Sequence, residues 1–527
     1  MKERLVEDWL INTGERGFEI PFCQILLAKG FRVLRVSHSP YEHGKDVLAV
    51  TPKGELHAYQ LKQGDVDLAT FEKHGEQIRA LVEADVEHPS IPRGKAHKPF
   101  FVTTGTIKDP VVDRILKMNA QWKRRGIPCL GYLDRRQLHA DFLSLASDFW
   151  PVEPPKIRAF RSLYLATGRA DLDKPELAKF LVELLTVPAG AKKSGILRRI
   201  SAANIFTSYL LSEFYRNEDH WSVFQGWIMT AAHIAWVAES HKLLDSTWER
   251  PFSLAVDAAE EALALLVQEA TKQDALSPHG FELDELTRSR LTICTGAIAA
   301  FNLIQLHRKP GIVIPQDLTE LVAGFVRNGR LLLWGEGAIA HFLSTIWFLE
   351  TTPAHSLSEH LICSMIDAII HINAHRGNLR LTAPYRDPDD VFVKLFEQKM
   401  QIPSQVEKES KESYTLESLV ALATRRMLRQ NLARRWRDIS WVTLASFTPK
   451  TPSETLLWRC SRGKERSYFS NQTQSWSKLL QQSRQQETKK LAAILVSRPD
   501  FALMFLLVYP HRVGVQLIKM LDAWMLN

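Results

Sequence analysis

Apolar and polar residues alternate along three neighbouring segments near the start of the chain, and this period of two predicts β-strands. The first segment covers residues 31–36. After a polar loop, residues 46–51 and 55–62 form two further segments, with Pro, Lys and Gly between them at 52–54. Because proline and glycine favour a turn, the second and third segments are predicted to be the two arms of an antiparallel hairpin.

The register of this hairpin follows from its turn. If the three turn residues are the loop, counting outward in pairs places Leu48 opposite Ala58 and Asp46 opposite Gln60. Opposed side chains share a face and lie about 5 Å apart at Cβ, and Lys62 emerges on the same face two residues beyond Gln60. The sequence therefore predicts that a carboxylate, an amide oxygen and an ammonium group converge at the open end of the hairpin.

Helical periodicity and helix-end signals place further elements around the hairpin. A helix is predicted from Gly17 to Lys29, with Glu19 near its start, and another begins after Asp67. A strand at residues 99–103, a helix at 109–126, a strand at 127–133 and a helix at 135–149 follow. The order helix, three strands, helix, strand, helix, strand, helix predicts an α/β domain with a mixed central sheet flanked by helices.

The predicted cluster has chemistry that suits phosphodiester hydrolysis. The Asp46 carboxylate, the Gln60 side-chain oxygen and the Leu61 carbonyl are hard oxygen ligands of the type that Mg²⁺ binds. Lys62 would orient or help deprotonate the attacking water and offset charge on the phosphoryl oxygens. The alternative is a set of solvated strand residues, because a similar spacing of Asp, Glu or Gln, and Lys arises by chance about once in a chain of this length.

These residues carry a resemblance to a known family. The stretch from about residue 14 to 145 resembles the PD-(D/E)XK nuclease superfamily, in particular its Mrr-like restriction-endonuclease branch. The features that carry the resemblance are Glu19 on the first predicted helix, a GKD motif ending in Asp46, QLK from Gln60 to Lys62, and FFVTTG at residues 100–105. Together they cover about a quarter of the chain.

The resemblance implies a role for each of these residues. Asp46 and Gln60 would bind a divalent metal, Mg²⁺ or alternatively Mn²⁺, with Glu19 supporting the metal site, and Lys62 would be catalytic. The wider superfamily more often has Glu where this chain has Gln60, and the Mrr-like branch has Gln. The amide carries no charge, so weaker metal binding is expected. Lys45 lies beside the expected site, where it would contact the nucleic acid.

Length and composition place the chain among multidomain globular proteins. Its 527 residues are too many for one compact core, and 45% hydrophobic with 24% charged residues is ordinary for a soluble protein. The five cysteines have no paired spacing, so neither a disulfide framework nor a zinc site is predicted, and a cytoplasmic location fits. The most apolar run begins at Phe501 and is less than half of the roughly twenty residues of a membrane span, which predicts a buried helix and no membrane association.

The chain changes character after a proline-rich junction at residues 150–156. From there onward apolar residues recur at helical spacing and strand-like runs are scarce, which predicts a large all-α region. We expect a nuclease domain at residues 1–150, a helical domain for sensing or oligomerisation at 151–400, an exposed polar linker at 401–413 and a C-terminal helical region with a basic face at 414–527.

Positive charge is concentrated near the C-terminus. The net charge is +8, and residues 421–470 hold eleven Lys and Arg against three acidic residues. A helix is predicted from Thr424 to Ile439, and a basic face on it would bind DNA phosphates. The residues of this face are Arg425, Arg429, Arg434 and Arg435. The alternative, equally compatible with the sequence, is a solvated basic helix paired with acidic helices of the same chain.

Together these features predict a Mg²⁺-dependent endodeoxyribonuclease controlled by its helical region. By resemblance it would be the effector nuclease of a prokaryotic restriction or anti-phage defence system. Its expected partners are DNA, a second protein such as a separately encoded NTPase or sensor, and further copies of itself in a homo-oligomer. Two alternatives stay open: a catalytically inactive nuclease fold that binds DNA or acts as a scaffold, and a nuclease that cleaves RNA.

Overall fold

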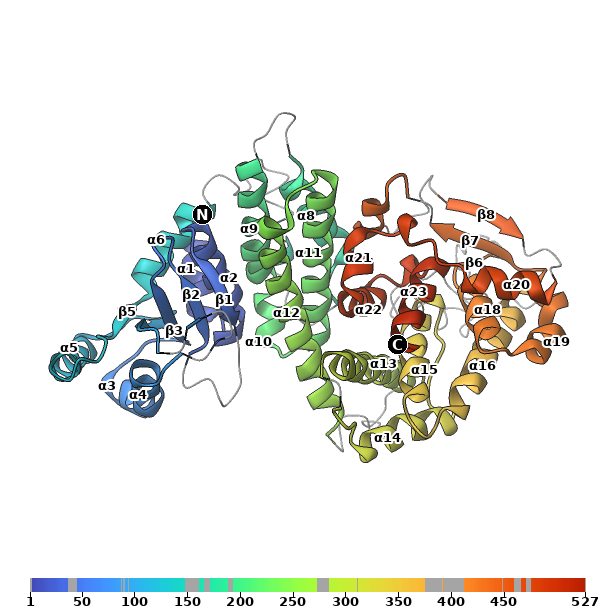
Figure 1. Cartoon of the computed structure of the whole chain (residues 1–527), viewed down its shortest axis with the longest axis horizontal. Coiled ribbons are helices and arrows are strands. Elements are labelled where there is room, and N and C mark those ends of the chain that lie inside the picture. The colour runs from blue at the N-terminus through green and yellow to red at the C-terminus, as the bar shows by residue number, and fades with distance from the viewer. Residues whose placement is uncertain are drawn as a thin grey trace. The chain divides into compact units, whose positions relative to one another are not determined.

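The computed structural model divides into two compact units, which are described separately. Unit 1 comprises residues 1–234 and 243–258, and unit 2 comprises residues 235–242 and 259–527 (Figure 1). The structure describes residues 2–36, 45–86, 88, 91–92, 94–146, 160, 162–164, 171–187, 193–272, 284–309, 311–374, 391, 412–447, 449–458, 466–470 and 475–526. Unit 1 contains a five-stranded sheet and unit 2 is mostly helical, so the predicted α/β N-terminal region and large helical region are confirmed.

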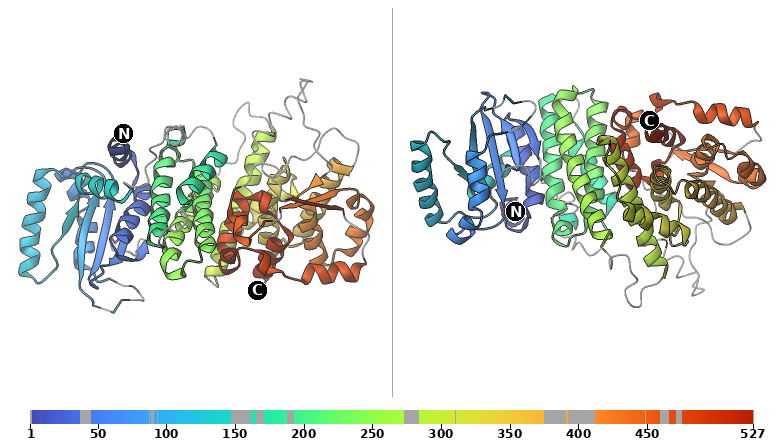
Figure 2. Two further views of the ribbon diagram at one scale, coloured as in Figure 1. Left: turned by 90° about the horizontal axis from the view of Figure 1, so that it is seen from above. Right: turned by 60° about the horizontal axis from the view of Figure 1, so that its bottom comes forward.

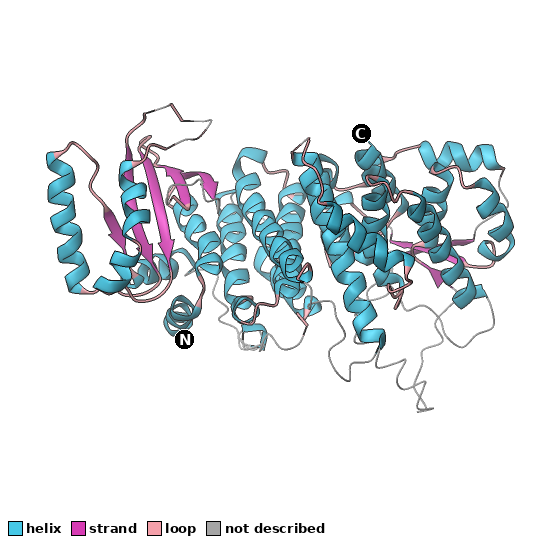
Figure 3. Ribbon diagram, turned by 90° about the horizontal axis from the view of Figure 1, so that it is seen from below, coloured by secondary structure: helices cyan, strands magenta, loops and turns pink. Residues whose placement is uncertain are grey.

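The central sheet of unit 1, whose strands are magenta in Figure 3, has the strand order β1-β2-β3-β4-β5. Strands β1, β2 and β3 are antiparallel neighbours, whereas β3, β4 and β5 are parallel. The strands are β1 Arg32–Val36, β2 Val47–Val50, β3 Leu56–Lys62, β4 His97–Thr103 and β5 Gly131–Leu133. Parallel neighbours require long crossovers, and helices occupy both of them. The predicted mixed sheet is therefore confirmed.

The hairpin formed by β2 and β3 has the register that the sequence predicts. Leu48 pairs with Ala58. The Thr51 amide donates a hydrogen bond to the Glu55 carbonyl at 2.9 Å and closes the turn. Gly54 has φ 84°, a left-handed conformation that glycine adopts without steric cost. The turn and the ladder together fix which side chains of β3 face each side of the sheet.

Helices cover both faces of this sheet, as the views in Figure 2 show. The helices of unit 1 up to residue 146 are α1 Lys2–Asn12, α2 Glu15–Ala28, α3 Leu68–Lys73, α4 Gly75–Glu83, α5 Asp109–Arg124 and α6 Arg135–Ala146. Helices α3, α4 and α5 enclose a mainly aliphatic core that includes Leu48, Leu56 and Ala58 of the hairpin. On the other face α1, α2 and α6 enclose an aromatic core, in which the Trp9 and Phe142 rings lie 5.1 Å apart.

Several helix boundaries differ from the prediction. Helix α1 is not among the predicted elements, and α2 begins at Glu15, before its predicted start at Gly17. The helix expected after Asp67 is divided into α3 and α4 at His74. Asp67 caps α3 as predicted, since its Oδ1 accepts a hydrogen bond from the Thr70 amide at 2.8 Å.

Unit 1 continues beyond the sheet into a group of helices. They are α8 Lys174–Leu185, α9 Lys193–Leu210, α10 Ser212–Arg216, α11 His220–Ser240 and α12 Asp245–Ala270, of which the last two extend into unit 2. Helix α2 lies along α9, and the ring of Trp9 on α1 is 4.7 Å from the ring of Tyr209 on α9. Because α1 and α2 pack against α9, the compact unit extends beyond the predicted domain end at residue 150.

Unit 2 is built mainly from helices. The α-helices that begin in it are α13 Asp284–Arg308, α14 Gln316–Arg327, α15 Ile339–Glu350, α16 Ser356–Ala374, α18 Leu416–Arg425, α19 Arg429–Ile439, α20 Trp476–Arg484, α21 Ala493–Ser497, α22 Pro499–Val508 and α23 Val515–Leu526. Short 3₁₀ helices join some of them: η1 Glu336–Ala338, η2 Pro452–Leu456, η3 Thr488–Lys490 and η4 Pro510–Arg512.

A small sheet in unit 2 corrects the prediction of an all-α region. It consists of β6 Glu412–Ser413, β7 Thr443–Phe447 and β8 Arg466–Ser470, with β6 parallel to β7 and β7 antiparallel to β8. These strands are too short for their alternation to stand out between helical segments. The predicted linker at 401–413 lies outside the described residues except for Glu412 and Ser413, which form β6 instead of an exposed connection.

A buried ion cluster joins three helices of unit 2. The side chain of Asp522 on α23 has no exposed surface and accepts hydrogen bonds from Arg425 of α18 and from Arg426, the C-cap residue of that helix. The Trp347 indole of α15 donates to the same carboxylate at 3.0 Å, and Arg426 also pairs with Glu350 of α15. Removing one member would leave a buried charge uncompensated, so this cluster holds α15, α18 and α23 in one arrangement.

The most apolar segment of the chain is an internal helix. Every side chain from Phe501 to Val508 of α22 is buried, which confirms the predicted buried helix. Across the described ranges, no helix combines the length and apolar character that crossing a membrane requires.

Candidate active site at the end of the hairpin

The predicted cluster lies where β2 begins and β3 ends. Asp46 directly precedes β2, and its Oδ2 accepts a hydrogen bond from the Leu61 amide at 2.6 Å. Val47 pairs with Tyr59, so Asp46 comes opposite Gln60 when the ladder is continued by one residue. The structure therefore brings together the carboxylate and the β3 segment that the sequence analysis placed side by side.

Gln60 has an unsatisfied acceptor in a buried position. Its side chain is 1% exposed, and its Nε2 donates a hydrogen bond to Gln77 Oε1 on α4 at 2.9 Å. The Gln60 Oε1 atom is also buried and has no hydrogen-bond partner among the described residues. An unsatisfied buried acceptor costs about 1–3 kcal/mol, so this oxygen marks a position where a further donor or a cation would be stabilising.

Lys62 is held by the first turn of α2. Its Nζ lies 3.0 Å from Glu15 Oε1, and the lysine side chain is 13% exposed. The sequence analysis missed Glu15, because the helix was expected to start at Gly17 and the actual helix begins two residues earlier with Gly14 as its N-cap. The signal that would have identified it is the spacing to Glu19, since residues four apart share one helix face.

Glu19 is buried on α2, with 3% of its surface exposed. It lies one turn beyond Glu15, whose carboxylate reaches Lys62, and therefore follows it on the same face of the helix. The prediction that Glu19 supports a metal site is compatible with this burial. The structure adds Glu15 as the helix α2 residue that contacts Lys62 directly.

His74 and Gln77 also belong to this cluster, and sequence reasoning missed both. His74 lies at the junction of α3 and α4 and shares a side-chain hydrogen bond with Gln77. Partial burial and the nearby charge of Lys62 lower the pKa of His74, while Gln77 and Glu15 oppose that shift. The imidazole is therefore neutral near pH 7 and able to accept a proton. The break between α3 and α4 places it there, and a continuous helix was predicted.

Lys45 does not occupy the position that the sequence analysis expected. Its side chain is buried, and its Nζ donates a hydrogen bond to the Ala80 carbonyl of α4 at 3.0 Å. Burial lowers the pKa of Lys45 to about 8, and Asp85 opposes this shift. The predicted contact of Lys45 with nucleic acid is therefore wrong for this conformation, because the ammonium is turned towards a backbone carbonyl inside the domain.

The chain that follows Lys62 is locked against the end of β4. A Cβ atom placed on Gly105 would lie 2.0 Å from the carbonyl carbon of Gly64, so the two backbones are in direct contact. Thr103 Oγ1 donates to the Gly64 carbonyl at 2.5 Å, and the Gly64 amide donates to Thr104 Oγ1 at 3.1 Å. The TTG segment of the FFVTTG motif therefore fixes the loop immediately after the candidate catalytic lysine.

The basic C-terminal helix is only partly accessible. Arg425 belongs to the buried ion cluster, and Arg435 forms a two-pronged ion pair with Asp367 of α16, so the prediction that these two bind DNA phosphates is corrected. Arg429 and Arg434 are exposed on α19, and the described part of the chain offers neither of them a salt bridge. Ion pairing within the chain was the alternative that the sequence left open, and it applies to half of the face.

The donor set at the hairpin consists of carboxylates and an amide. Within the residues that the structure describes, no group of three or more His, Cys, Asp and Glu side chains is arranged to hold a metal ion. The Gln60 amide oxygen does not belong to those residue types, so a cation here would rely on fewer formal charges than an all-acidic site. No family model, curated protein or solved structure matches this chain.

Replacing Gly105 by Ala is expected to destabilise unit 1 by at least about 2 kcal/mol, because the added methyl group would meet the Gly64 backbone and force the loop after Lys62 to move. The measurement is urea unfolding followed by circular dichroism. Gly75→Ala is the matched control, since nothing lies within 4 Å of its Cβ position, and it should be neutral or stabilising by up to about 1 kcal/mol. Equal stability of the two variants would contradict the contact.

Proposed function

We propose that unit 1 carries a metal-dependent endonuclease that hydrolyses phosphodiester bonds in DNA. The observation that carries this proposal is the end of the β2–β3 hairpin, where Asp46 is bonded to Leu61 and the buried Gln60 Oε1 has no partner in the described structure. Lys62 follows two residues after Gln60 on the same strand, and its ammonium lies 3.0 Å from Glu15 Oε1. The groups at this strand end are a carboxylate, an unsatisfied amide oxygen and a lysine. Groups of these types bind metal ions and stabilise phosphoryl oxygens in phosphodiester hydrolysis.

The residues present fit a hard divalent cation. Gln60 Oε1 is a buried acceptor that a cation would satisfy, and Asp46 opposite it supplies a negative charge. Mg²⁺, or alternatively Mn²⁺, prefers such oxygen donors and keeps several of its waters. Asp46, Gln60, the Leu61 carbonyl and Glu19 are the groups that would hold it. When bound, such an ion polarises a phosphoryl oxygen and lowers the pKa of water.

The remaining roles fall to the side chains around Lys62. Its ammonium would stabilise negative charge on the phosphoryl oxygens, and Glu15 holds it in place through the 3.0 Å contact. His74 is neutral near pH 7 and lies within the electrostatic reach of Lys62, which makes it a proton acceptor beside the site. Gln77 orients the amide of Gln60 by accepting from its Nε2.

The sheet supports the resemblance to the PD-(D/E)XK superfamily and its Mrr-like branch. A helix precedes three antiparallel strands, and a helical crossover leads to a fourth strand parallel to the third, in the order that the resemblance implies. A catalytically inactive DNA-binding or scaffold protein is the alternative. The unsatisfied oxygen of Gln60 favours an active nuclease over this alternative. A residue with a purely structural role at this buried position would be more stable if it were apolar or had all its hydrogen bonds satisfied.

The proposed biological setting is a prokaryotic restriction or anti-phage defence system. This setting rests on the resemblance. A nuclease must be restrained in its host, and we propose that the large helical region supplies this restraint. A partner protein such as an NTPase or sensor, or assembly of several copies, would relieve that restraint. RNA is the alternative substrate, and the fold does not distinguish it from DNA.

Asp46→Asn and Lys62→Ala should each lower cleavage by at least about 10², because one removes the anionic metal ligand and the other the cation beside the phosphate. Asparagine keeps an oxygen that can accept from the Leu61 amide, so the fold should survive. The assay incubates the full chain with Mg²⁺ and plasmid, linear duplex, single-stranded DNA or RNA, with EDTA removing activity. Lys53→Ala in the exposed turn is the control, and undiminished cleavage by both site variants would exclude this active site.

Gln60→Leu should abolish cleavage, whereas Gln60→Glu should retain it and tighten metal binding, because only the second change keeps an oxygen donor and adds charge. Gln77→Met removes the hydrogen-bond partner of Nε2 without touching Oε1, so its effect should be much smaller. Metal affinity by calorimetry and cleavage rates are the two readouts. A fully active leucine variant would show that Gln60 serves only the strand.

Reversing the charge of Arg429 and Arg434 together should weaken DNA association and reduce the salt slope of log K by about 2, because two phosphate contacts are lost. The matched control reverses two exposed cations elsewhere in unit 2, Lys309→Glu with Arg327→Glu. Binding is measured by fluorescence anisotropy at several salt concentrations in EDTA. Arg435 is left unchanged because it pairs with Asp367. Identical behaviour of the two double variants would rule out a specific role for α19.

A further inference from the structure

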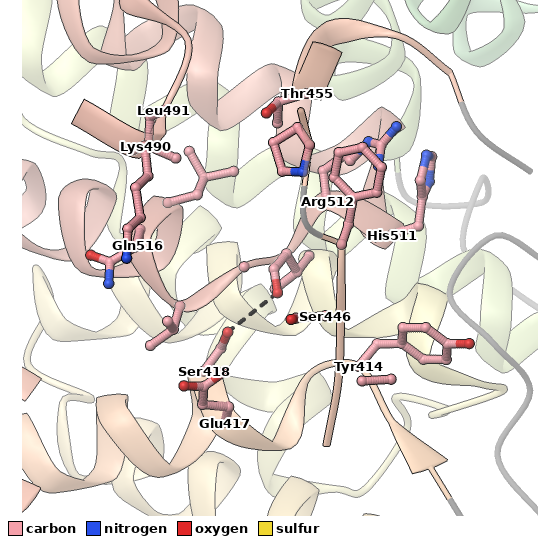
Figure 4. A pocket seen from close by; sticks show the side chains of 17 residues that line it. Tyr414, Glu417, Ser418, Ser446, Thr455, Lys490, Leu491, His511, Arg512 and Gln516 are labelled. Atoms are coloured by element: carbon pink, nitrogen blue, oxygen red, sulfur yellow. Dashed lines mark hydrogen bonds between the residues drawn. The ribbon is translucent and has the colours of Figure 1, made fainter. Parts of the chain in front are cut away.

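Unit 2 contains a cavity that the proposed nuclease activity does not use. Its volume is about 380 Å³, within the range of about 300–1,000 Å³ typical of small-molecule sites. The walls come from α18, β7, the 3₁₀ helices η2 and η3, and the segment that joins η4 to α23 (Figure 4). Five parts of the chain that are distant in sequence therefore meet around one space.

One part of the cavity wall is apolar. Side chains of four aliphatic residues and one aromatic residue line it, and they are Leu491, Val513, Val515, Leu517 and Phe447. Val513 and Leu517 are themselves buried against the rest of unit 2. Contact between this apolar wall and a hydrophobic part of a ligand would favour binding by about 25 cal/mol per Å² of apolar surface removed from water.

The charged side chains around the cavity are mainly cationic. Arg512 is 4% exposed, its guanidinium carbon lies 3.3 Å from the centroid of the Phe447 ring, and one of its NH₂ groups donates to the Leu457 carbonyl at 2.7 Å. Lys490 lies on the opposite side of the cavity, at the exposed rim, where its ammonium forms an ion pair with Glu487 (Figure 4). Burial raises the pKa of Glu417, the acidic residue of the lining, while Lys519 opposes this shift.

Hydrogen-bonding groups complete the lining. Ser418 Oγ donates to the Val513 carbonyl at 3.3 Å at the base of the cavity, where Figure 4 also shows Ser446. Gln516 lies beside Lys490 and accepts from the Glu487 amide at 3.0 Å. A ligand in this space would therefore meet an apolar wall, a few oriented polar groups and cations on two sides, which is the usual composition of an organic-ligand site.

We propose that this cavity binds a small organic anion, with an apolar body against the Val513 and Leu517 wall and a carboxylate or phosphate group held by Lys490 and Arg512. The sign follows from the lining, which contains the cations Lys490 and Arg512 and the single carboxyl group of Glu417. The ion pair of Lys490 with Glu487 is exposed, and because such a pair contributes little stability, an anionic ligand can replace Glu487 as the partner of the ammonium. The size follows from the volume, which accommodates one ring-containing molecule and excludes a folded peptide. The proposal is independent of the nuclease assignment, because every lining residue belongs to unit 2.

Occupation of the cavity would stabilise unit 2. The ligand would contact segments between Tyr414 and Leu517 that are distant from one another in sequence. Ligand that binds the folded form raises the free energy of unfolding in proportion to the logarithm of its concentration above the dissociation constant. Unfolding temperature therefore provides a readout that does not depend on nuclease activity.

The test uses the full chain and 8-anilinonaphthalene-1-sulfonate, an aromatic anion whose fluorescence rises in apolar surroundings. We expect saturable binding, weakened at least about tenfold by Lys490→Glu and abolished by Ser446→Trp, which fills the cavity. Lys489→Glu is the matched control, since this exposed neighbour does not line the cavity, and it should bind the probe like the original chain. Circular dichroism verifies folding of each variant, and Lys490→Glu alone decides the matter if the tryptophan variant does not fold.

Competition identifies the anionic group. Phenyl phosphate and benzoate should displace the probe and raise the unfolding temperature, and the stronger competitor of the two distinguishes a phosphate from a carboxylate ligand. Benzyl alcohol, of similar size without charge, should compete at least about tenfold more weakly. Equal competition by the alcohol, or equal probe affinity in the Lys490 and Lys489 variants, would overturn the proposal.

Discussion

The pairing of Leu48 with Ala58 determines which face of the central sheet the candidate site residues Gln60 and Lys62 occupy. A slip of one residue would turn Gln60 and Lys62 to the opposite face of the sheet and bring Leu61 into their place. Two constraints prevent this slip. The Thr51–Glu55 turn closes one end of the hairpin, and the hydrogen bond from the Leu61 amide to Asp46 closes the other. The same carboxylate therefore fixes the register and serves the proposed metal site.

Acidic side chains come to this strand end from two elements. Asp46 directly precedes β2, Glu15 and Glu19 lie on α2, and Lys62 contacts Glu15. Burial lowers the pKa of Lys45, adjacent in sequence to Asp46, to about 8, and its Nζ donates to the Ala80 carbonyl of α4. The proposed cation would therefore be held by these acidic side chains together with the unsatisfied Gln60 oxygen.

Local sequence patterns were sufficient where neighbouring residues decide the structure. The hairpin, its register and the Asp67 cap follow from alternation, a turn and a capping residue, all within a few residues of one another. Tertiary contacts were not predictable in this way. Lys45 turns to the Ala80 carbonyl and Arg435 to Asp367, partners 35 and 68 residues away. The cavity of unit 2 was equally inaccessible, because its lining is gathered from separated segments.

The contact between Gly64 and Gly105 also has an evolutionary consequence. Gly64 has φ 79°, which favours glycine on conformational grounds, and Gly105 has no room for a side chain beside it. The two positions are constrained for different reasons: Gly64 by its left-handed backbone conformation, and Gly105 by the Gly64 backbone that lies against it. Homologous chains should therefore keep both glycines together while the surrounding sequence diverges. The pattern Gln-x-Lys-x-Gly followed by Thr-Thr-Gly is accordingly a more discriminating signature for distant relatives than the proposed metal ligands alone.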